Sequence, residues 1–411
     1  MELQTDAAVC PASGATSHVR DTGTNSQGDC DIVVRLEIRK NMQTASLIVG
    51  GLGSLIVDVS LSPSFLQIQT SEQSERFCIP ADVKLLPSSC RIMHQIAGEG
   101  LYMQLKVETA NNTDMPLLLK EILKIQNNYT FYCQSCGEVI IKEQQFFRVL
   151  PLPGENWSSL IEEWCCHPDP FANRSCLPKV NDCFLGDTFL LLNTANISDP
   201  IVENNEKSSV PRLADANALK SKENTKVICK RCKAMLGEKV SSDAIKYYIT
   251  EIMIHPSSQG YCMISRMQFL ESILVRLLME HSNCRSTFRF CIQESDGKHF
   301  LLLWLLNTDT LLVESPRKPG TQNNCFFSDN NVMASSRALE ARNAMRVLFL
   351  PCSENRNKQL ADKWMNDTGA HPLTFPLNTC LELILLLSLN NTSLPNSLRF
   401  MNNWQVSYLK M

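Results

Sequence analysis

Two pairs of cysteines, each with the spacing Cys-x-x-Cys, constrain this 411-residue chain more than any other feature. The first pair is Cys133 and Cys136, and the second pair is Cys229 and Cys232. A Cys-x-x-Cys turn directs both sulfur atoms to one point, and two such turns supply the four thiolates of a tetrahedral zinc site. The pattern therefore predicts a structural zinc ion that connects residue 133 to residue 232. The segment between them, which we call the excursion, would leave the zinc site and return to it.

Two other interpretations of these cysteines stay open, because one pair can be redox-active, or all four thiols can be buried without a metal. Gly137 follows the first pair directly, and Gly237 lies five residues after Cys232. Glycine lets backbone N–H groups approach a thiolate without a clash from Cβ, which favours the zinc site. Since structural zinc sites are coordinatively closed, the predicted site stabilises the fold and carries out no reaction.

The composition indicates a folded protein with reduced thiols. Hydrophobic residues make up 44% of the chain, which suffices for two or three packed cores. The 18 cysteines would suit a secreted disulfide scaffold, yet the first residues lack the apolar core of a signal peptide. We therefore expect a cytoplasmic protein, with the nucleus as a second location.

Charge and hydropathy exclude two classes of partner. The formal net charge is only −3, so no overall field favours direct binding to nucleic acid or to an anionic membrane. The longest apolar runs begin at Phe300 and Leu381 and have about half of the ~20 residues that a membrane crossing requires. We expect no membrane span.

The pattern of short apolar runs predicts an α+β protein with several regions. Residues 1–30 are polar and aperiodic, which predicts a disordered tail. From residue 31 short alternating runs recur at roughly ten-residue spacing, which indicates an N-terminal antiparallel β domain over 31–130. Residues 131–240 form the zinc-clamped central junction, and residues 241–411 form a C-terminal mixed α+β region.

Individual elements follow from the same patterns. A helix is expected from Met115 and another from Met263 to His281, the latter with one broad apolar face. Asn307 to Asp309 read as a turn between two strands. Residues 335–350 begin with a serine cap and predict a helix that runs into a strand, and a further helix is expected from Thr379.

Within the excursion, residues 151–184 are unusually rich in Trp, Cys, His and Pro. Pro168 and Pro170 prevent a helix after His167, so a short helix must end there with its last side chains directed outward. The side chains of this loop are Trp164, Cys165, Cys166 and His167. Residues 199–226 are polar and predict a disordered insert.

Several strings spread along the chain resemble one family. They are TFYCQSCGEVIIK, RVLPLP, EWCCHPDPFAN, NTKVICKRCKAMLGE, CLELILLLSLNN and the closing YLKM. Together they resemble the HECT-like ubiquitin-protein ligases that bind the mitotic ubiquitin-conjugating enzyme. The resemblance runs from about residue 32 to the C-terminus and leaves only the tail uncovered.

The resemblance implies a transferase that accepts ubiquitin from a conjugating enzyme and passes it to substrate lysines, with cyclin-type proteins among the substrates. A HECT ligase does this through a thioester on its own cysteine, which lies in a Thr-Cys pair near the C-terminus. Thr379-Cys380 matches that pair, and Cys380 is the expected nucleophile. A helix N-terminus lowers a thiol pKa, whereas the apolar helix that follows favours an inert buried thiol, so both interpretations stay open.

The resemblance also implies a contact with the conjugating enzyme within about residues 255–277. The residues expected to make this contact are Met267, Phe269, Leu270, Ile273 and Leu274. A helix with an apolar face can lie in a groove of a partner, and it can equally pack on its own sheet.

A third implied feature concerns the segment EWCCHPDPF. It resembles a motif with which such proteins cap the active site of a zinc-dependent endonuclease, a subunit of the cleavage and polyadenylation specificity factor. Cys166 is the expected donor to the nuclease metal, and Trp164, Cys165 and His167 shape the turn. Two alternatives stay open: a second internal zinc site that includes Cys183, and a protein that only inhibits or assembles the pre-mRNA nuclease without enzymatic activity.

Overall fold

The structure is a computed structural model, and β-strands predominate in the part of the chain that it describes. The described residues are 32–51, 58–69, 74–109, 123–152, 177–196, 202–204, 225–259, 261–315, 337–353, 355–367 and 369–411. The predicted tail, the short helix before His167 and the whole Trp-Cys-Cys-His loop lie outside these ranges, as does most of the helix expected from Met115.

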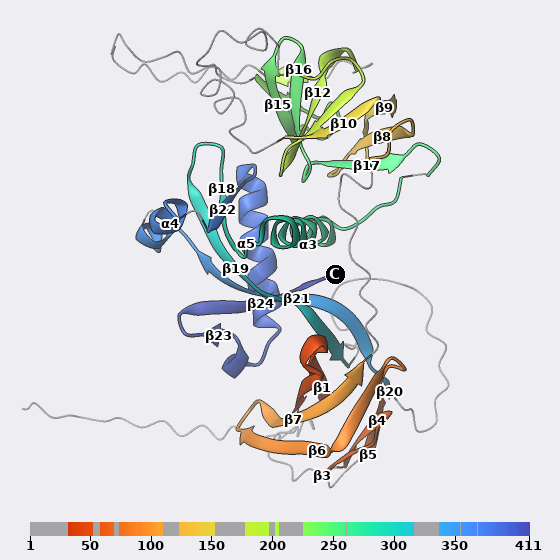
Figure 1. Cartoon of the computed structure of the whole chain (residues 1–411), viewed down its shortest axis with the longest axis vertical. Helices are drawn as coiled ribbons and strands as arrows, with labels where there is room; N and C mark the ends of the chain where they lie inside the picture. The colour runs from red at the N-terminus through yellow and green to blue at the C-terminus, as the bar shows by residue number, and fades with distance from the viewer. Residues whose placement is uncertain are drawn as a thin grey trace, which may run out of the picture.

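The largest sheet has ten strands and combines strands from both ends of the described chain (Figure 1). Its main path has the order β23-β24-β21-β19-β1-β2-β7-β6, and β18 pairs with β19 and with β22. The strand bounds are β1 (Val33–Arg39), β2 (Thr44–Gly50), β6 (Val83–Ile96), β7 (Gly100–Thr109), β18 (Arg289–Gln293), β19 (His299–Glu314), β21 (Glu340–Pro351), β22 (Ala370–Thr374), β23 (Phe400–Met401) and β24 (Trp404–Lys410).

Three smaller sheets complete the described part of the fold. A seven-stranded sheet has the order β10-β11-β12-β16-β15-β14-β13, a three-stranded sheet the order β17-β8-β9, and a four-stranded sheet the order β20-β5-β4-β3. Their strands are β3 (Asp58–Leu61), β4 (Phe65–Gln69), β5 (Ser74–Cys78), β8 (Asn128–Cys133), β9 (Val139–Gln145), β10 (Arg148–Pro151), β11 (Asp182–Leu185), β12 (Phe189–Asn193), β13 (Val202–Asn204), β14 (Thr225–Ile228), β15 (Met235–Ser241), β16 (Ala244–Tyr248), β17 (Ile252–Pro256) and β20 (Arg337–Ala338).

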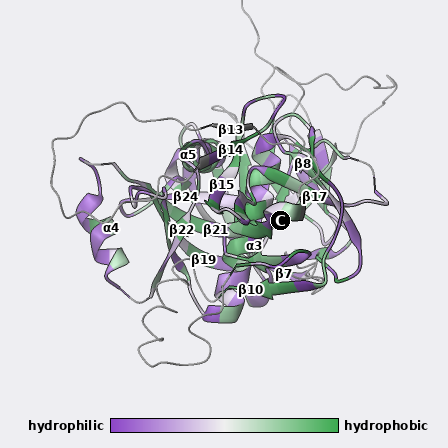
Figure 2. Ribbon diagram, turned by 90° about the horizontal axis from the view of Figure 1, so that it is seen from above, coloured by the Kyte–Doolittle hydropathy of each residue, from purple (hydrophilic) through white to green (hydrophobic). Residues whose placement is uncertain are grey.

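Three α-helices lie beside the large sheet: α3 (Arg266–Arg285), α4 (Lys358–Met365) and α5 (Leu377–Thr392). The Ser265 side chain caps α3 by accepting a hydrogen bond from the backbone N–H of Gln268. Figure 2 shows that α4 stands out to one side of the molecule and is mostly hydrophilic. None of the described helices is long and apolar enough to cross a membrane.

The main hydrophobic core joins the seven-stranded and three-stranded sheets to helices α3 and α5. It contains Phe131 of β8, Tyr247 of β16, Leu278 of α3 and Leu387 of α5, all of which are fully buried. A second core lies between the N-terminal strands of the large sheet and the four-stranded sheet. Because the main core is continuous from the cysteine hairpins to α5, a change at the hairpins can affect the helices.

The α+β class agrees with the strands and three helices of the described residues, but the N-terminal strands do not close on themselves. Strand β1 pairs along its length with β19, with Leu36 opposite Val313. Strands β1, β2, β6 and β7 of the expected N-terminal β domain therefore continue the C-terminal sheet, whereas β3, β4 and β5 belong to the four-stranded sheet. The domain boundaries at residues 130 and 240 stay predictions.

Two predictions about single elements are wrong. The turn expected at Asn307 to Asp309 is an irregularity inside the continuous strand β19, where the pairing with β21 shifts register. The helix expected within 335–350 is absent, because β20 and β21 occupy the described residues of that range. Of the insert expected to be disordered at 199–226, residues 202–204 form β13, which pairs with β14, and residues 205–224 lie outside the described residues, so that expectation stays a prediction.

Candidate functional site

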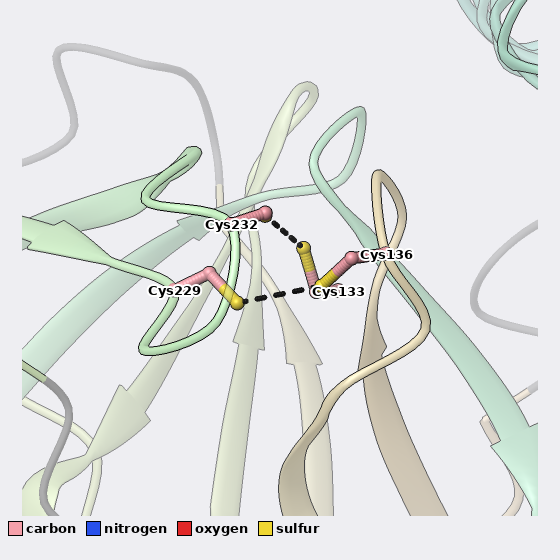
Figure 3. Close-up of side chains that lie close together, drawn as sticks. All are labelled: Cys133, Cys136, Cys229 and Cys232. Atoms are coloured by element: carbon pink, nitrogen blue, oxygen red, sulfur yellow. Dashed lines mark hydrogen bonds between the residues drawn. The ribbon is translucent and has the colours of Figure 1, made fainter.

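The two Cys-x-x-Cys pairs lie at the tips of two β-hairpins that face each other (Figure 3). Cys133 and Cys136 belong to the turn between β8 and β9, and Cys229 and Cys232 to the turn between β14 and β15. The Sγ atoms of Cys133 and Cys232 are 3.6 Å apart, and those of Cys136 and Cys229 are 3.7 Å apart. All four sulfur atoms lie within 4.8 Å of one another. The structure thus brings the four predicted cysteines together.

The two turns hold their cysteines with the same backbone hydrogen bond. The N–H of Gly137 donates to the carbonyl oxygen of Cys133 at 2.8 Å, and the N–H of Lys233 donates to that of Cys229 at 3.0 Å. Both donors have a left-handed backbone, with φ of 73° at Gly137 and 64° at Lys233. Glycine adopts this conformation readily, whereas lysine does so at a cost of about 1–2 kcal/mol. The second turn is therefore strained, and a favourable interaction of its cysteines is needed to offset that strain.

The role expected for Gly237 is corrected by the structure. This residue lies within β15, away from the turn, and a Cβ atom there would be 2.0 Å from the carbonyl oxygen of Lys246 on the neighbouring strand. Glycine is needed at this position for the close approach of β15 and β16. The turn position that corresponds to Gly137 is occupied by Lys233.

The geometry and the electrostatics of the cluster are compatible with a structural zinc ion. A Zn–S distance of about 2.3 Å places the sulfur atoms of a tetrahedral site about 3.8 Å apart, close to the separations above. Burial raises the pKa of the Cys133 thiol, so that it ionises only next to a positive charge. At Cys229 burial acts in the same direction, but the backbone N–H groups of Cys232 and Arg231 outweigh it and lower the pKa. Four protein ligands would leave no open position on the ion.

Arg266, at the start of α3, connects the cysteine hairpins to both central helices. Its Nη1 donates to the side-chain oxygen of Gln134, the neighbour of Cys133, at 3.1 Å. Its Nη2 donates to Glu251 at 2.9 Å and to Glu382 of α5 at 2.8 Å. Burial acts to lower the pKa of Arg266, but the carboxylates of Glu251 and Glu382 raise it. The guanidinium is therefore a fixed positive charge at the centre of the junction.

The predicted nucleophile has the surroundings of a core thiol. Cys380 is 0% exposed, and its Sγ lies 3.6 Å from the carbonyl oxygen of Gln293 and 3.7 Å from that of Phe375. Burial, followed by the charge of Glu294, raises the pKa of Cys380 to about 12. Its neighbour Thr379 is also 0% exposed. The protonated, enclosed thiol favours the structural interpretation of the Thr-Cys pair.

Most of the residues expected to contact the conjugating enzyme face the core. Leu270, Ile273 and Leu274 are 1%, 4% and 1% exposed, and Met267 and Phe269 are partly buried against the same core. These five side chains hold α3 in place, as the second interpretation of this helix proposed. Of these five side chains, only those of Met267 and Phe269 are exposed enough for a partner to contact.

An exposed apolar stripe lies instead on α5, beside α3 (Figure 1). The exposed fractions of its four leucines are 42% at Leu377, 50% at Leu381, and 53% at both Leu385 and Leu389. Residues four apart lie on one face of a helix, so the four leucines form a continuous row. We call this row the leucine stripe. Its first member, Leu377, lines an open groove together with Met263, Ile264 and Cys136.

The capping residues Trp164, Cys165, Cys166 and His167 lie outside the described residues. Both ends of their segment are described, however. Leu152 and Leu177 pack against one small core, and the N–H of Leu152 donates to the carbonyl oxygen of Leu185 at 2.7 Å. Cys183, the fourth donor of the alternative internal site, is 0% exposed, and no cluster of metal donors among the described residues includes it.

Sequence reasoning missed the Arg266 network and the leucine stripe for different reasons. The network joins residues from four distant segments, and no local spacing signals it. The stripe was visible as leucines spaced by four residues, but the helix from Thr379 is apolar on several faces, so its exposed side could not be assigned.

Comparison with known proteins places the chain in a family. Residues 37–406 match the model of the family described as HECT-like ubiquitin-conjugating enzyme (E2)-binding. A mouse protein whose name describes it as an E3 ubiquitin-protein ligase is 46% identical over 380 residues, which cover 92% of this chain and 98% of the mouse protein. The human protein of the same name is 44% identical over 385 residues, with the same coverage of each chain.

A more distant similarity extends to budding yeast. An uncharacterized protein of Saccharomyces cerevisiae is 20% identical over 300 residues, which cover 71% of this chain and 72% of the yeast protein. No solved structure matches the chain. The family match spans nearly all of the described residues, and the mouse and human proteins are similar over almost their full lengths, so this chain belongs to the HECT-like E2-binding family.

Proposed function

We propose that this protein is a ubiquitin-protein ligase that binds a conjugating enzyme charged with ubiquitin and promotes transfer to substrate lysines. The observation that carries this proposal is the E2-binding family match over residues 37–406, together with relatives that are named as ubiquitin ligases. Ubiquitin, the mitotic conjugating enzyme and cyclin-type substrates are the partners expected, and the cytoplasm and nucleus the expected locations. In this proposal the four cysteines bind a zinc ion that stabilises the fold and takes no part in the transfer reaction.

The route of transfer that we propose does not pass through Cys380. Thioester exchange needs a thiolate that a second protein can reach, and Cys380 is fully buried with a pKa raised to about 12. Among the described cysteines outside the metal cluster, Cys262 and Cys284 are exposed. The simplest mechanism is that this protein positions the charged conjugating enzyme, whose own thioester is then attacked by the substrate.

We propose that the leucine stripe and the adjacent residues Met263 and Ile264 form the docking surface for the conjugating enzyme. Met263 is 82% exposed and Ile264 39% exposed, and both precede α3 within the segment that the family resemblance assigns to this contact. Rows of exposed apolar side chains on one helix face are a common way to fill a groove in a partner. Of the other residues expected at this contact, Leu270, Ile273 and Leu274 are buried in the core.

The variant Leu381→Glu/Leu385→Glu tests the docking surface. Both side chains are about half exposed, so the fold should tolerate the change, whereas a carboxylate in an apolar contact is unpaired and costly. We expect binding of the charged conjugating enzyme, measured by surface plasmon resonance, to weaken by at least tenfold, which corresponds to about 1.4 kcal/mol. Ubiquitin transfer should fall in parallel. Phe400→Glu, at a residue of β23 that is 59% exposed, is the matched control and should bind normally. Equal affinity of both variants would contradict the docking surface.

The route of transfer has its own test in Cys380→Ala, with Cys291→Ala as a matched buried cysteine. Cys291 is also 0% exposed, and burial raises its pKa to about 12 as well. Each change removes little volume and should cost about 1 kcal/mol of folding free energy. We expect both variants to retain ubiquitin transfer near the wild-type rate. Loss of transfer in Cys380→Ala alone, together with loss of a thiol-sensitive ubiquitin adduct on a non-reducing gel, would establish a thioester on Cys380.

The second function that we propose is inhibition of the zinc-dependent pre-mRNA 3′-end endonuclease through Cys166. One structural observation favours it: strands β10 and β11 pair in parallel, so both ends of the segment that carries Cys166 are fixed at one edge of a sheet. Fixed ends reduce the conformational entropy that a loop loses when it binds. The same loop would also suit a protein that inhibits or assembles the nuclease without ligase activity.

Cys166→Ser tests this second function. A serine hydroxyl is a much weaker zinc ligand than a thiolate, so we expect the variant to release the purified nuclease from inhibition and to weaken the complex. Binding of the conjugating enzyme and ubiquitin transfer should stay at wild-type levels. If the variant inhibits as well as the wild type, Cys166 does not contact the nuclease metal. If it lowers the zinc content of the isolated protein, Cys166 is an internal ligand.

A further inference from the structure

A second group of metal-binding side chains lies away from the four cysteines. Asp187 lies in the turn between β11 and β12, His281 near the end of α3, and His371 in β22. One donor atom from each of the three residues lies within 4.8 Å of the other two. Nε2 of His371 is 2.9 Å from Oδ2 of Asp187, and Nε2 of His281 is 3.8 Å from Oδ1 of Asp187. Three elements that are distant in the sequence thus direct a carboxylate and two imidazoles to one point.

His281 is the unusual member of this group. Its side chain is 2% exposed, and neither of its ring nitrogens has a hydrogen-bond partner. A buried polar atom without a partner is unfavourable, and in a native structure it calls for an explanation such as a missing ion or water. The ring of His371 lies 4.1 Å away between centroids, and Phe290 packs edge-on at 5.9 Å, so neither neighbour offers a hydrogen bond.

An ordinary ion pair accounts for only part of the arrangement. The Asp187 carboxylate accepts a hydrogen bond from His371, and Nη1 of Arg285 lies 3.7 Å from its Oδ2. These contacts leave the nitrogens of His281 unpaired. A neutral imidazole carries a lone pair on one ring nitrogen, and at His281 no protein group accepts or donates a hydrogen bond at either nitrogen.

We propose that Asp187, His281 and His371 bind a divalent transition-metal ion, and that zinc is the ion best suited to them. Zinc prefers imidazole nitrogen and carboxylate oxygen at about 2.0–2.2 Å, which places neighbouring donors of a tetrahedral site about 3.3 Å apart. The widest separation in the cluster, within 4.8 Å, would have to shorten by at most about 1.5 Å. The ion would take the lone pair of His281 that no protein group uses.

The site has a different character from the four-cysteine cluster. Three protein donors leave a fourth position for water or another small ligand, and the side chains of Asp187 and His371 are 13% and 19% exposed, so solvent reaches it. Arg285, whose side chain is 40% exposed, can turn outward and leave room for the ion. The ion would join the β11–β12 turn to α3 and β22, and would thereby fasten the seven-stranded sheet to the large sheet.

The zinc content of the purified chain tests the site, provided that no histidine tag is used. After equilibration with micromolar zinc chloride, we expect mass spectrometry to find close to two zinc ions in the wild type. His281→Gln and His371→Gln should each contain one, and the control His94→Gln, at an exposed histidine, should keep two. His371→Gln serves as the decisive variant if the buried His281→Gln folds poorly.

X-ray absorption at the zinc edge adds a measurement that needs no variant. The wild type should show nitrogen or oxygen ligands in addition to sulfur, and His371→Gln should show sulfur alone. A wild type with one zinc ion and only sulfur ligands overturns the proposal, and so does a second zinc ion that survives His371→Gln. Binding of the conjugating enzyme should be unchanged in His371→Gln, so this test is independent of the proposed ligase function.

Discussion

At the scale of single residues, the junction behind the cysteine hairpins depends on one guanidinium. Arg266 is the shared partner of Glu251 and Glu382, and Glu251 also accepts a hydrogen bond from Thr379 at 2.6 Å. The side chain of Glu251 is 10% exposed, so its charge has little access to water. A buried carboxylate is tolerated only while its partner is present.

Replacing Arg266 should therefore lower the stability of the fold strongly. We expect Arg266→Ala to lower the free energy of unfolding by about 3–5 kcal/mol, because it leaves Glu251 buried and unpaired. The control is Arg342→Ala, which removes an ion pair with Glu340 whose two side chains are each 56% exposed and should cost no more than about 1 kcal/mol. Urea unfolding followed by circular dichroism measures both. Equal losses in the two variants would show that the Arg266 network is not a buried charge cluster.

The residues of the site were predictable only where their spacing is local. Each Cys-x-x-Cys pair is visible in four consecutive residues, and the chemistry of zinc requires that the two pairs meet. The contacts of Arg266 join residues 134, 251, 266 and 382, and no pattern within one segment reveals them. The Thr379-Cys380 pair shows a different limit of sequence reasoning. The sequence reveals the motif, but it does not reveal that both residues are buried.

At the scale of elements, strands and helices with a clear period were predicted well. The helix expected over Met263–His281 is α3, and the helix expected from Thr379 is α5. The predictions failed where strand pairing in the sheet outweighed a local sequence preference for a turn or a helix. Asn307 to Asp309 resemble a turn, but the partner strand β21 continues past them and the irregularity is absorbed as a shift of register.

Strand β21 shows the same effect on a helical signal. Alanine, arginine, glutamate and methionine favour a helix in residues 336–346, yet residues from Glu340 onward form β21, which pairs with β19 and, from Ala344 onward, also with β24. The buried side chains of β21, which include Ala344, Met345 and Val347, are held by that pairing. Intrinsic helix preference amounts to less than about 1 kcal/mol per residue, and a strand with two neighbours gains more from its contacts.

At the scale of the whole molecule, two features hold distant parts of the chain together. The first is the ten-stranded sheet, in which β1 lies between β2 and β19 and so joins the N-terminal strands to the C-terminal ones. The second is the pair of cysteine hairpins, whose facing turns close the long excursion. Sequence patterns identified the second feature but not the first, because strand order depends on pairings between segments that are far apart.

The two features should respond differently when zinc is lost. In the predicted four-cysteine site the free energy of binding is also free energy of folding, and for small zinc domains it amounts to about 10 kcal/mol or more at pH 7. Cys229→Ser removes one ligand, and the strained turn at Lys233 is then no longer offset by a metal. We expect the variant to lose the zinc ion of this site and to open locally at the hairpins β8–β9 and β14–β15.

Hydrogen–deuterium exchange can distinguish local opening from global unfolding. In Cys229→Ser the amides of both hairpins should exchange much faster than in the wild type, and α3 and α5 should lose protection near Arg266, whose partner Gln134 follows Cys133 directly. Strands β1, β2 and β7 should keep their protection, because their core lies apart from the hairpins. Cys284→Ser, at an exposed cysteine outside the cluster, provides the control and should leave exchange unchanged. If the hairpins of Cys229→Ser stay fully protected, the four cysteines do not depend on a metal for their arrangement.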